Sequence, residues 1–306
     1  MNAKGNSSLE LSGLNGSNLL AFLAAVGTLR SLSTAWPEEP VRMYWKRKAG
    51  WCPVIVTEQP LDEETLVATL HRRLRTMHDH PALAVDDNLK IPPDRFRQYA
   101  AEACDQAHRT GDRTWADFVA AFGCDVIAQD KVIQDTAFRT MSGAGHQHFL
   151  KTMRELIEVT EPEHLRKALF QPWTYDDGRP SLRWDPEDDR RYALRWNEPS
   201  GDPIRTVRGA NRLAIEALPL FPTAPVRSSL ETTGFRTGGS RDTFFTWPIW
   251  SCAIPIDVVR TLLAIKELQQ DDPDRRRLLA HGVVEVYRCQ RLTIGKYRNF
   301  APARTV

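Results

Sequence analysis

Residues 16–32, GSNLLAFLAAVGTLRSL, predict one long helix around which the N-terminal region is arranged. Ser17 or Asn18 can accept a hydrogen bond from the first free backbone N–H groups of such a helix. Apolar and long side chains then recur at helical spacing, at Leu19, Phe22, Leu23, Val26, Leu29 and Arg30. We therefore expect this helix to lie on the core.

Strands are predicted on both sides of this helix. A short apolar stretch, residues 9–14, precedes it, and Trp36 and Pro37 end it. VRMYW (41–45) alternates between apolar and polar residues, and the apolar CPVIV (52–56) follows. The chain is therefore expected to begin with the order strand, helix, strand, strand.

Residues 61–168 show a helical pattern. The predicted helices are LDEETLVATLHRRLRTMHDH (61–80), PDRFRQYAAEACDQAHR (93–109), TWADFVAAFG (114–123), GHQHFLKTMRELIEV (145–159) and LRKALF (165–170). Acids gather in first turns and arginines in last turns, which complements the helix dipoles. This indicates a helical insertion or subdomain.

The strand pattern returns near residue 180. SLRW (181–184) and RYALRW (191–196) are predicted to form a hairpin around the acidic turn DPEDDR. Helices are predicted at 207–221 and 257–270, a glycine-rich loop at 232–242, an apolar segment at 243–254, and strand-like segments at 283–288 and 291–300. We predict an α+β protein in which residues 1–60 and 171–306 form a mixed-sheet domain and residues 61–170 form a helical subdomain.

Length and cysteine content set broad limits. A chain of 306 residues can bury a large core. The five cysteines form no CxxC pair and lie far apart, which favours reduced thiols over a zinc cluster or a disulfide framework. No apolar run is long enough for a membrane span. The expected location is the cytoplasm.

Basic residues gather at the C-terminal end, although the net charge is only +2. Residues 275–306 contain one acid, Glu285, and the following basic side chains: Arg275, Arg276, Arg277, Arg288, Arg291, Lys296, Arg298 and Arg304. Such a local excess of positive charge is typical of a surface that contacts an anionic partner. We expect a basic module there.

Histidines and acids are candidate ligands for hydrolytic metal chemistry. HDHP supplies His78, Asp79 and His80, and His71 lies seven residues earlier. A catalytic metal needs several fixed ligands, and no further ligand is indicated. A solvated helix end before Pro81 is the simpler interpretation.

Two other segments allow a functional and a structural interpretation. GAGHQHF separates His146 and His148 in a way that disfavours shared chelation, while the preceding SGAG could approach a phosphate or simply begin a helix. Asp185, Glu187, Asp188 and Asp189 could hold a divalent metal, but a solvated hairpin turn is favoured. We find no Walker phosphate loop, GxSxG, HExxH or dinucleotide fingerprint. Metal and cofactor are therefore expected to be absent, and the protein is expected not to be an enzyme.

Two segments suit nucleic-acid binding. In TTGFRTGGSRD, Arg236 and Arg241 flank glycines, so that backbone and forked guanidiniums could approach phosphates; an ordinary hairpin loop is the alternative. Near the C-terminal end, Tyr287, Tyr297 and Phe300 interleave with basic residues, although such aromatics also pack on cores. The predicted nucleic-acid-binding residues are Arg236, Gly238, Gly239, Arg241, Arg275, Arg276, Arg277, Arg288, Arg291, Lys296, Tyr297 and Arg298.

Several stretches occur together in a recognisable order. They are LNGSNLLAFLAAVGTLRSL with WCPV behind it, MSGAGHQHFLKTMREL, LFQPWTYDDGRPSLRWDPEDDRRYAL and GANRLAIEALPLFP. The combination resembles proteins of CRISPR type I-G (formerly type I-U) loci. Two families fit: the reduced large subunit of the Cascade effector, and the companion family related to the helicase-nuclease extension.

The resemblance implies a non-enzymatic subunit of a crRNA-guided complex in antiviral defence. Its partners would be the effector backbone subunits, crRNA, target DNA and the helicase-nuclease. A large subunit of this kind recognises the protospacer-adjacent motif, holds the displaced strand and helps to recruit the helicase-nuclease. No catalytic residue is carried over. The alternatives are a metal-dependent nuclease or HD-type phosphohydrolase, and a protein-only adaptor.

Overall fold

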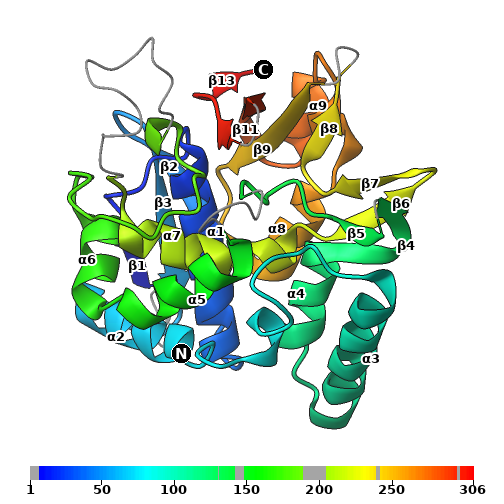
Figure 1. The fold of residues 1–306 in the computed structure, drawn as a ribbon. Helices are drawn as coiled ribbons and strands as arrows, with labels where there is room; N and C mark the ends of the chain where they lie inside the picture. Colours follow the sequence, from blue (N-terminus) through cyan, green and yellow to red (C-terminus); the bar gives the residue numbers. More distant parts are fainter. Residues whose placement is uncertain (1–6, 130, 142–147, 189–204, 239–241, 295–296) are drawn as a thin grey trace.

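The computed structural model describes residues 7–129, 131–141, 148–188, 205–238, 242–294 and 297–306, and it is an α+β fold (Figure 1). Its helices are α1 (Leu19–Ala35), α2 (Glu63–Arg75), α3 (Pro93–Thr110), α4 (Thr114–Phe122), α5 (Phe149–Val159), α6 (Pro162–Phe170), α7 (Arg208–Ile215), α8 (Ile256–Leu263) and α9 (Arg275–Ala280). Short 3₁₀ turns cover Pro81–Leu83, Pro186–Asp188, Leu218–Leu220 and Lys266–Gln269. The predicted fold class is thus confirmed.

The N-terminal sheet has the order β1-β3-β2-β10. Its strands are β1 (Ser7–Glu10), β2 (Arg42–Arg47), β3 (Trp51–Thr57) and β10 (Ile254–Pro255), and all neighbours are antiparallel. The predicted start, strand, helix, strand, strand, is confirmed.

The C-terminal sheet has the order β12-β11-β9-β8, with β13 (Arg304–Thr305) also paired to β11. Its strands are β8 (Phe235–Thr237), β9 (Thr243–Trp250), β11 (Val283–Ile294) and β12 (Tyr297–Phe300). The two strand-like segments predicted at 283–288 and 291–300 are therefore one long strand and a second strand that folds back on it. Part of the predicted glycine-rich loop is strand β8.

Two hairpins complete the strands. β4 (Gly123–Gln129) pairs with β5 (Val132–Asp135), and β6 (Thr223–Val226) pairs with β7 (Ser229–Thr232). The first hairpin lies inside the segment predicted to be wholly helical. Its two strands are short and joined by few residues. The sequence of this segment therefore shows neither a helical nor a strand periodicity over enough residues to predict the hairpin.

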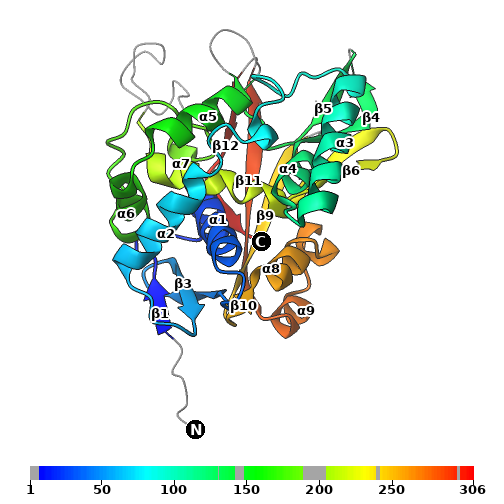
Figure 2. The same ribbon diagram turned by 90° about the horizontal axis from the view of Figure 1, so that it is seen from below.

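Helix α1 lies at the centre of the molecule (Figure 2). Asn18 is its N-cap and accepts a hydrogen bond from the Ala21 backbone at 3.0 Å, which decides between the two predicted caps. The helix is buried on all sides over Leu19–Leu32, because both sheets and several helices cover it. Sequence periodicity had predicted one buried face only.

Aromatic rings join the two sheets to α1. The Phe22 ring lies 5.9 Å from Trp45 of β2 and 5.7 Å from Trp247 of β9, and Trp45 meets the edge of Trp250. The indole N–H groups of Trp247 and Trp250 donate to the carbonyls of Gly16 and Met43 across 2.8 Å. The N- and C-terminal parts of the chain therefore share one core.

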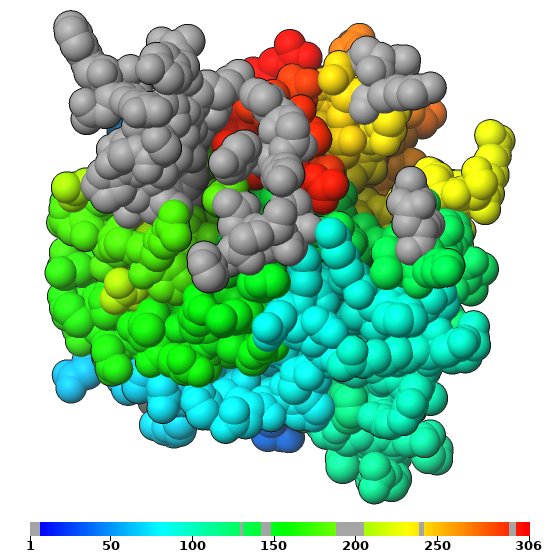
Figure 3. Space-filling view, viewed as in Figure 1, coloured from blue at the N-terminus to red at the C-terminus, as the bar shows by residue number. Residues whose placement is uncertain are grey.

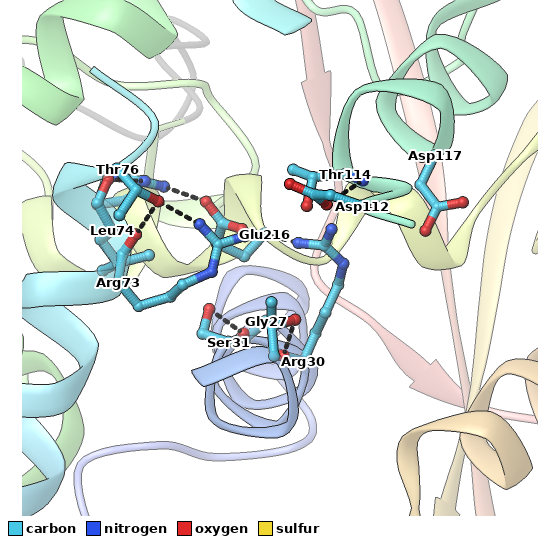
Figure 4. A network of polar contacts seen from close by, with 12 residues as sticks. Gly27, Arg30, Ser31, Arg73, Leu74, Thr76, Asp112, Thr114, Asp117 and Glu216 are labelled. Atoms are coloured by element: carbon cyan, nitrogen blue, oxygen red, sulfur yellow. Dashed lines mark hydrogen bonds and ion pairs between the residues drawn. The ribbon is translucent and has the colours of Figure 1, made fainter. Parts of the chain in front are cut away.

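A buried ion network joins α1, α2 and α7 (Figure 4). The Glu216 carboxylate, directly after α7, accepts from Arg30 at 2.8 Å and from Arg212 at 3.0 Å. Arg212 also donates to the carbonyl of Leu74 at 2.8 Å. Burial alone would raise the pKa of Glu216, but the guanidiniums of Arg212 and Arg30 outweigh it and hold the pKa below its ordinary value.

The segment after residue 180 differs from the prediction. Ser181–Trp184 is not a strand, and RYALRW lies outside the described residues, so the predicted hairpin is wrong in its first half. Asp185 is 1% exposed and accepts from the Asn18 amide at 3.0 Å and the Tyr175 hydroxyl at 3.2 Å. The predicted solvated turn is therefore wrong for this residue, and burial raises the pKa of its carboxyl.

Helices α2, α5 and α6 pack around α1 and α7, and one continuous apolar core includes side chains from all of them. The proposed division of the chain into two domains stays a prediction. Within the described ranges, no helix is both long and apolar enough to span a bilayer.

Candidate nucleic-acid interface

A cleft of about 820 Å³ lies between the C-terminal sheet and the β4–β5 and β6–β7 hairpins. Its basic side chains are Lys90, Arg139, Arg236, Lys266, Arg291 and Arg298, and its acidic ones are Asp135 and Glu231. In the space-filling view, the C-terminal strands (red) reach the surface beside β8 and β9 (yellow) at the upper edge of the molecule (Figure 3). With six basic and two acidic side chains in its lining, the cleft has an excess of positive charge.

Strand register brings Arg291 and Arg298 side by side. Arg291 of β11 is paired with Phe300, and the next residue but one, Thr293, is paired with Arg298 of β12. Residues two apart on a strand point to the same face, so both guanidiniums face the hairpin layer. Their Nη groups converge on one acceptor, the carbonyl oxygen of Arg139, at 2.9 Å from Arg291 and 3.4 Å from Arg298.

Arg139 lies just after β5 and adds a third guanidinium to this group. Its Nε is 2.7 Å from the Asp135 carboxylate, and its Nη1 donates to the carbonyl of Met141 at 2.7 Å. We call Arg139, Arg291, Arg298 and Asp135 the arginine cluster. It contains three cations and one anion.

Burial and mutual repulsion act on the charges of the arginine cluster. Burial, reinforced by the neighbouring Arg298, lowers the pKa of Arg291 to about 10. Burial, and then Arg139, also lowers the pKa of Arg298. Burial raises the pKa of Asp135, although Arg139 partly offsets the effect. An added anion would relieve the repulsion among the three guanidiniums.

Arg236 reaches the cleft from the edge strand β8. Its guanidinium lies 5.7 Å from the centre of the Phe244 ring and forms an ion pair with Asp271. Gly238 donates to the carbonyl of Asp242 at 2.8 Å and closes the β8–β9 connection. Gly239 and Arg241 lie outside the described residues, as do Lys296 and the side chain of Tyr297.

Arg288 is buried, although it was predicted to bind nucleic acid. It is 3% exposed, and its guanidinium donates to the Thr246 hydroxyl at 2.9 Å and to the carbonyls of Leu268 and Gln270 at 3.0 and 2.6 Å. Burial lowers its pKa to about 10. This arginine therefore holds the turn Lys266–Gln269 against the sheet and does not face a ligand.

Two of the aromatic residues near the C-terminal end are also buried, although they were predicted to suit base stacking. Tyr287 is 8% exposed and packs on Trp247, and Phe300 is fully buried. Both belong to the core and offer no face on which a base could stack.

Arg275, Arg276 and Arg277 form the start of α9, far from the arginine cluster along the sheet. Helix α9 packs near the start of β11, where Val283 is paired with Trp250, whereas Arg291 is paired with Thr243 at the other end. Arg275 forms an ion pair with Glu285 at 2.8 Å, and Arg277 forms one with Glu267 at 3.4 Å. The predicted basic module is thus divided into two separate places.

Four charged residues of the cleft were not predicted from the sequence. Lys90, Asp135 and Arg139 come from the hairpin side, and Lys266 belongs to the turn Lys266–Gln269, which packs against β9. Arg139 has no charged neighbour within three residues along the chain, so composition gave no signal. It meets Arg291 only because the β5 segment lies against the C-terminal sheet.

The candidate metal ligands are not gathered. His78 forms an ion pair with the adjacent Asp79 at 2.8 Å, and His80 Nδ1 accepts from the Ala82 backbone at 3.2 Å. Asp185 lies beside Asn18 instead. Among the residues that the structure describes, no three His, Cys, Asp or Glu side chains are placed to hold a metal ion. The SGAG segment lies outside the described residues.

Comparison of the chain with protein-family models, curated proteins and solved structures gave no significant match.

Proposed function

We propose that this chain is a non-enzymatic, cytoplasmic subunit of a type I-G CRISPR effector complex, and that it binds target DNA or crRNA through the cleft. The observation that carries the proposal is the convergence of Arg291 and Arg298 on the main-chain carbonyl of Arg139, whose own guanidinium pairs with Asp135. Guanidiniums provide forked donors that match phosphate oxygens. The resemblance to type I-G proteins supplies the biological context.

The chemistry of the cleft favours contact with the nucleic-acid backbone over base recognition. Thr237 and Thr243 add hydroxyls beside the arginines, while the one aromatic residue lining the described cleft, Phe235, is only 8% exposed. Phosphate contacts of this kind position a strand without specifying its sequence. In the assembled complex, the subunit would contribute to recognition of the protospacer-adjacent motif, to binding of the displaced strand and to recruitment of the helicase-nuclease.

The test is direct binding of labelled single-stranded DNA, duplex DNA and RNA over a range of salt concentrations. For single strands, the dependence of log affinity on log salt changes by about 0.7 for each phosphate contact. The double variant Arg291→Gln/Arg298→Gln should weaken binding and reduce this slope by about 1.4.

The matched control is Arg275→Gln/Arg276→Gln, which removes the same charge from exposed positions on α9. It should retain most of the affinity. Equal losses in the two double variants would contradict the assignment to the cleft, and binding that is absent at every salt concentration would favour a protein-only adaptor. Manganese-dependent cleavage of the labelled strands that is lost in His78→Ala would favour the nuclease alternative.

A further inference from the structure

The arginine cluster has the charge of a site for a doubly charged anion. Its three guanidiniums and one carboxylate leave two positive charges uncompensated, and all four groups line the cleft. We propose that this cluster binds a terminal phosphate, that is a phosphate monoester, and that Asp135 sets its selectivity. The inference refines the proposed function, because a strand end is one source of such a group.

The geometry leaves donors available for a ligand. The Arg139 carbonyl engages one Nη group of Arg291 and one of Arg298. The Nε of Arg291 is buried and has no hydrogen-bond partner among the described residues. A buried donor without a partner costs free energy, which a bound oxygen would recover. The main-chain carbonyl thus holds the two guanidiniums beside each other at the cleft, and the Nε of Arg291 keeps an unused donor.

Charge distinguishes the two forms of phosphate. A phosphate monoester carries about −1.5 to −2 charge near pH 7, whereas each phosphodiester of a strand carries one negative charge. Two uncompensated cations therefore match the monoester more closely. Without Asp135 the cluster would present three, and its attraction for the singly charged phosphodiesters of any strand would also rise.

The shape of the cleft supports a strand end or a nucleotide over a duplex. A volume of about 820 Å³ is within the range of small-ligand sites, about 300–1,000 Å³. A terminal phosphate can enter alone, with the rest of its molecule outside.

The experiment compares two oligonucleotides of one sequence, one with a 5′-phosphate and one with a 5′-hydroxyl, by isothermal titration. Because it gains an additional charge-assisted contact, the phosphorylated strand should bind at least about tenfold more tightly. Arg291→Gln should abolish this difference but retain weak binding of both strands. Inorganic phosphate and a nucleoside monophosphate, tested by thermal shift, identify the minimal ligand.

Each outcome has a defined meaning. Stabilisation by inorganic phosphate that depends on Arg291, without any binding of oligonucleotides, would support the terminal-phosphate site and contradict the proposed function. Equal affinity for the two strands and no stabilisation by phosphate would overturn the site, even if nucleic acid binds. If Arg291→Gln does not fold, Arg298→Gln serves in its place, because Arg298 makes only the longer, 3.4 Å contact.

Discussion

The guanidinium of Arg291 donates to the main-chain carbonyl of Arg139 at 2.9 Å, although 152 positions separate the two residues. The contact uses the backbone of Arg139 and leaves its side chain to pair with Asp135. A neutral acceptor thus holds two cations close together. The local repulsion between them persists, and this makes the cluster receptive to an anion.

Asp135→Asn should strengthen binding of a 5′-hydroxyl single strand at neutral pH. The folded protein holds the pKa of Asp135 above its ordinary value through burial, so its carboxyl takes up a proton at a higher pH than an ordinary aspartate. As the pH falls through this raised pKa, the negative charge disappears and the affinity of the wild type should rise. Fluorescence anisotropy at several pH values measures this change in affinity.

The Asp135→Asn protein provides the control for this pH effect, because it has no carboxyl to titrate at that position. Its affinity should vary little over the same interval. A parallel rise in both proteins would assign the effect to another group.

Arg288→Met should lower the free energy of unfolding without changing the salt dependence of binding. The substitution leaves the carbonyls of Leu268 and Gln270 without their buried donor, and each such loss costs about 1–3 kcal/mol. Urea denaturation measures the first effect and salt titration the second. If a folded Arg288→Met protein shows a reduced salt slope, Arg288 contacts the nucleic acid and the prediction is contradicted.

Glu216→Gln should destabilise the protein by about 3–5 kcal/mol, because it leaves two buried guanidiniums without their counter-ion. The lowered pKa of Glu216 also has a consequence in acid. Its ionised form stabilises the fold above the ordinary glutamate pKa, and that contribution is lost as the pH falls through the lowered value. Urea unfolding of the wild type at neutral and acidic pH should show this loss as a lower midpoint in acid. If Glu216→Gln and the wild type unfold at the same urea midpoint at neutral pH, the predicted destabilisation is contradicted.

Gly27→Ala should disrupt the contact between α1 and α7. An added Cβ would lie 2.0 Å from the carbonyl oxygen of Leu213, so one helix has to move, and overpacking of this kind costs about 1–3 kcal/mol. Gly178→Ala is the control, since a Cβ there meets nothing within 4 Å. Thermal unfolding of the two variants separates close packing from the general effect of alanine, and equal melting temperatures would show that the helices can separate at little cost.

Local patterns predicted most of the helices and the α+β class. Helix α3 was found with its boundaries almost unchanged, because its apolar face and the terminal Gly111 are local signals. The β4–β5 hairpin and Asp185 were not predicted. The hairpin is too short to show a periodicity, whereas the environment of Asp185 is set by Asn18, the N-cap of α1, which lies 167 positions away along the chain.

For the candidate site, too, the sequence identified some residues and missed others that depend on contacts between distant parts of the chain. Sequence composition identified the basic C-terminal end, but it could not distinguish Arg288, whose partners are buried carbonyls, from Arg291, whose neighbours are other cations. Arg139 carried no signal, because its contribution depends on the packing of β5 against the C-terminal sheet.

The order of elements around the cleft bears on how the site is made during synthesis. Lys90 and Arg139 leave the ribosome well before Arg291 and Arg298, which close the opposite wall. A growing chain thus has no complete arginine cluster until the last strands pair. Ligand affinity at this site should accordingly report completion of folding, and a nascent chain should pass through synthesis without capturing the nucleic acid around it.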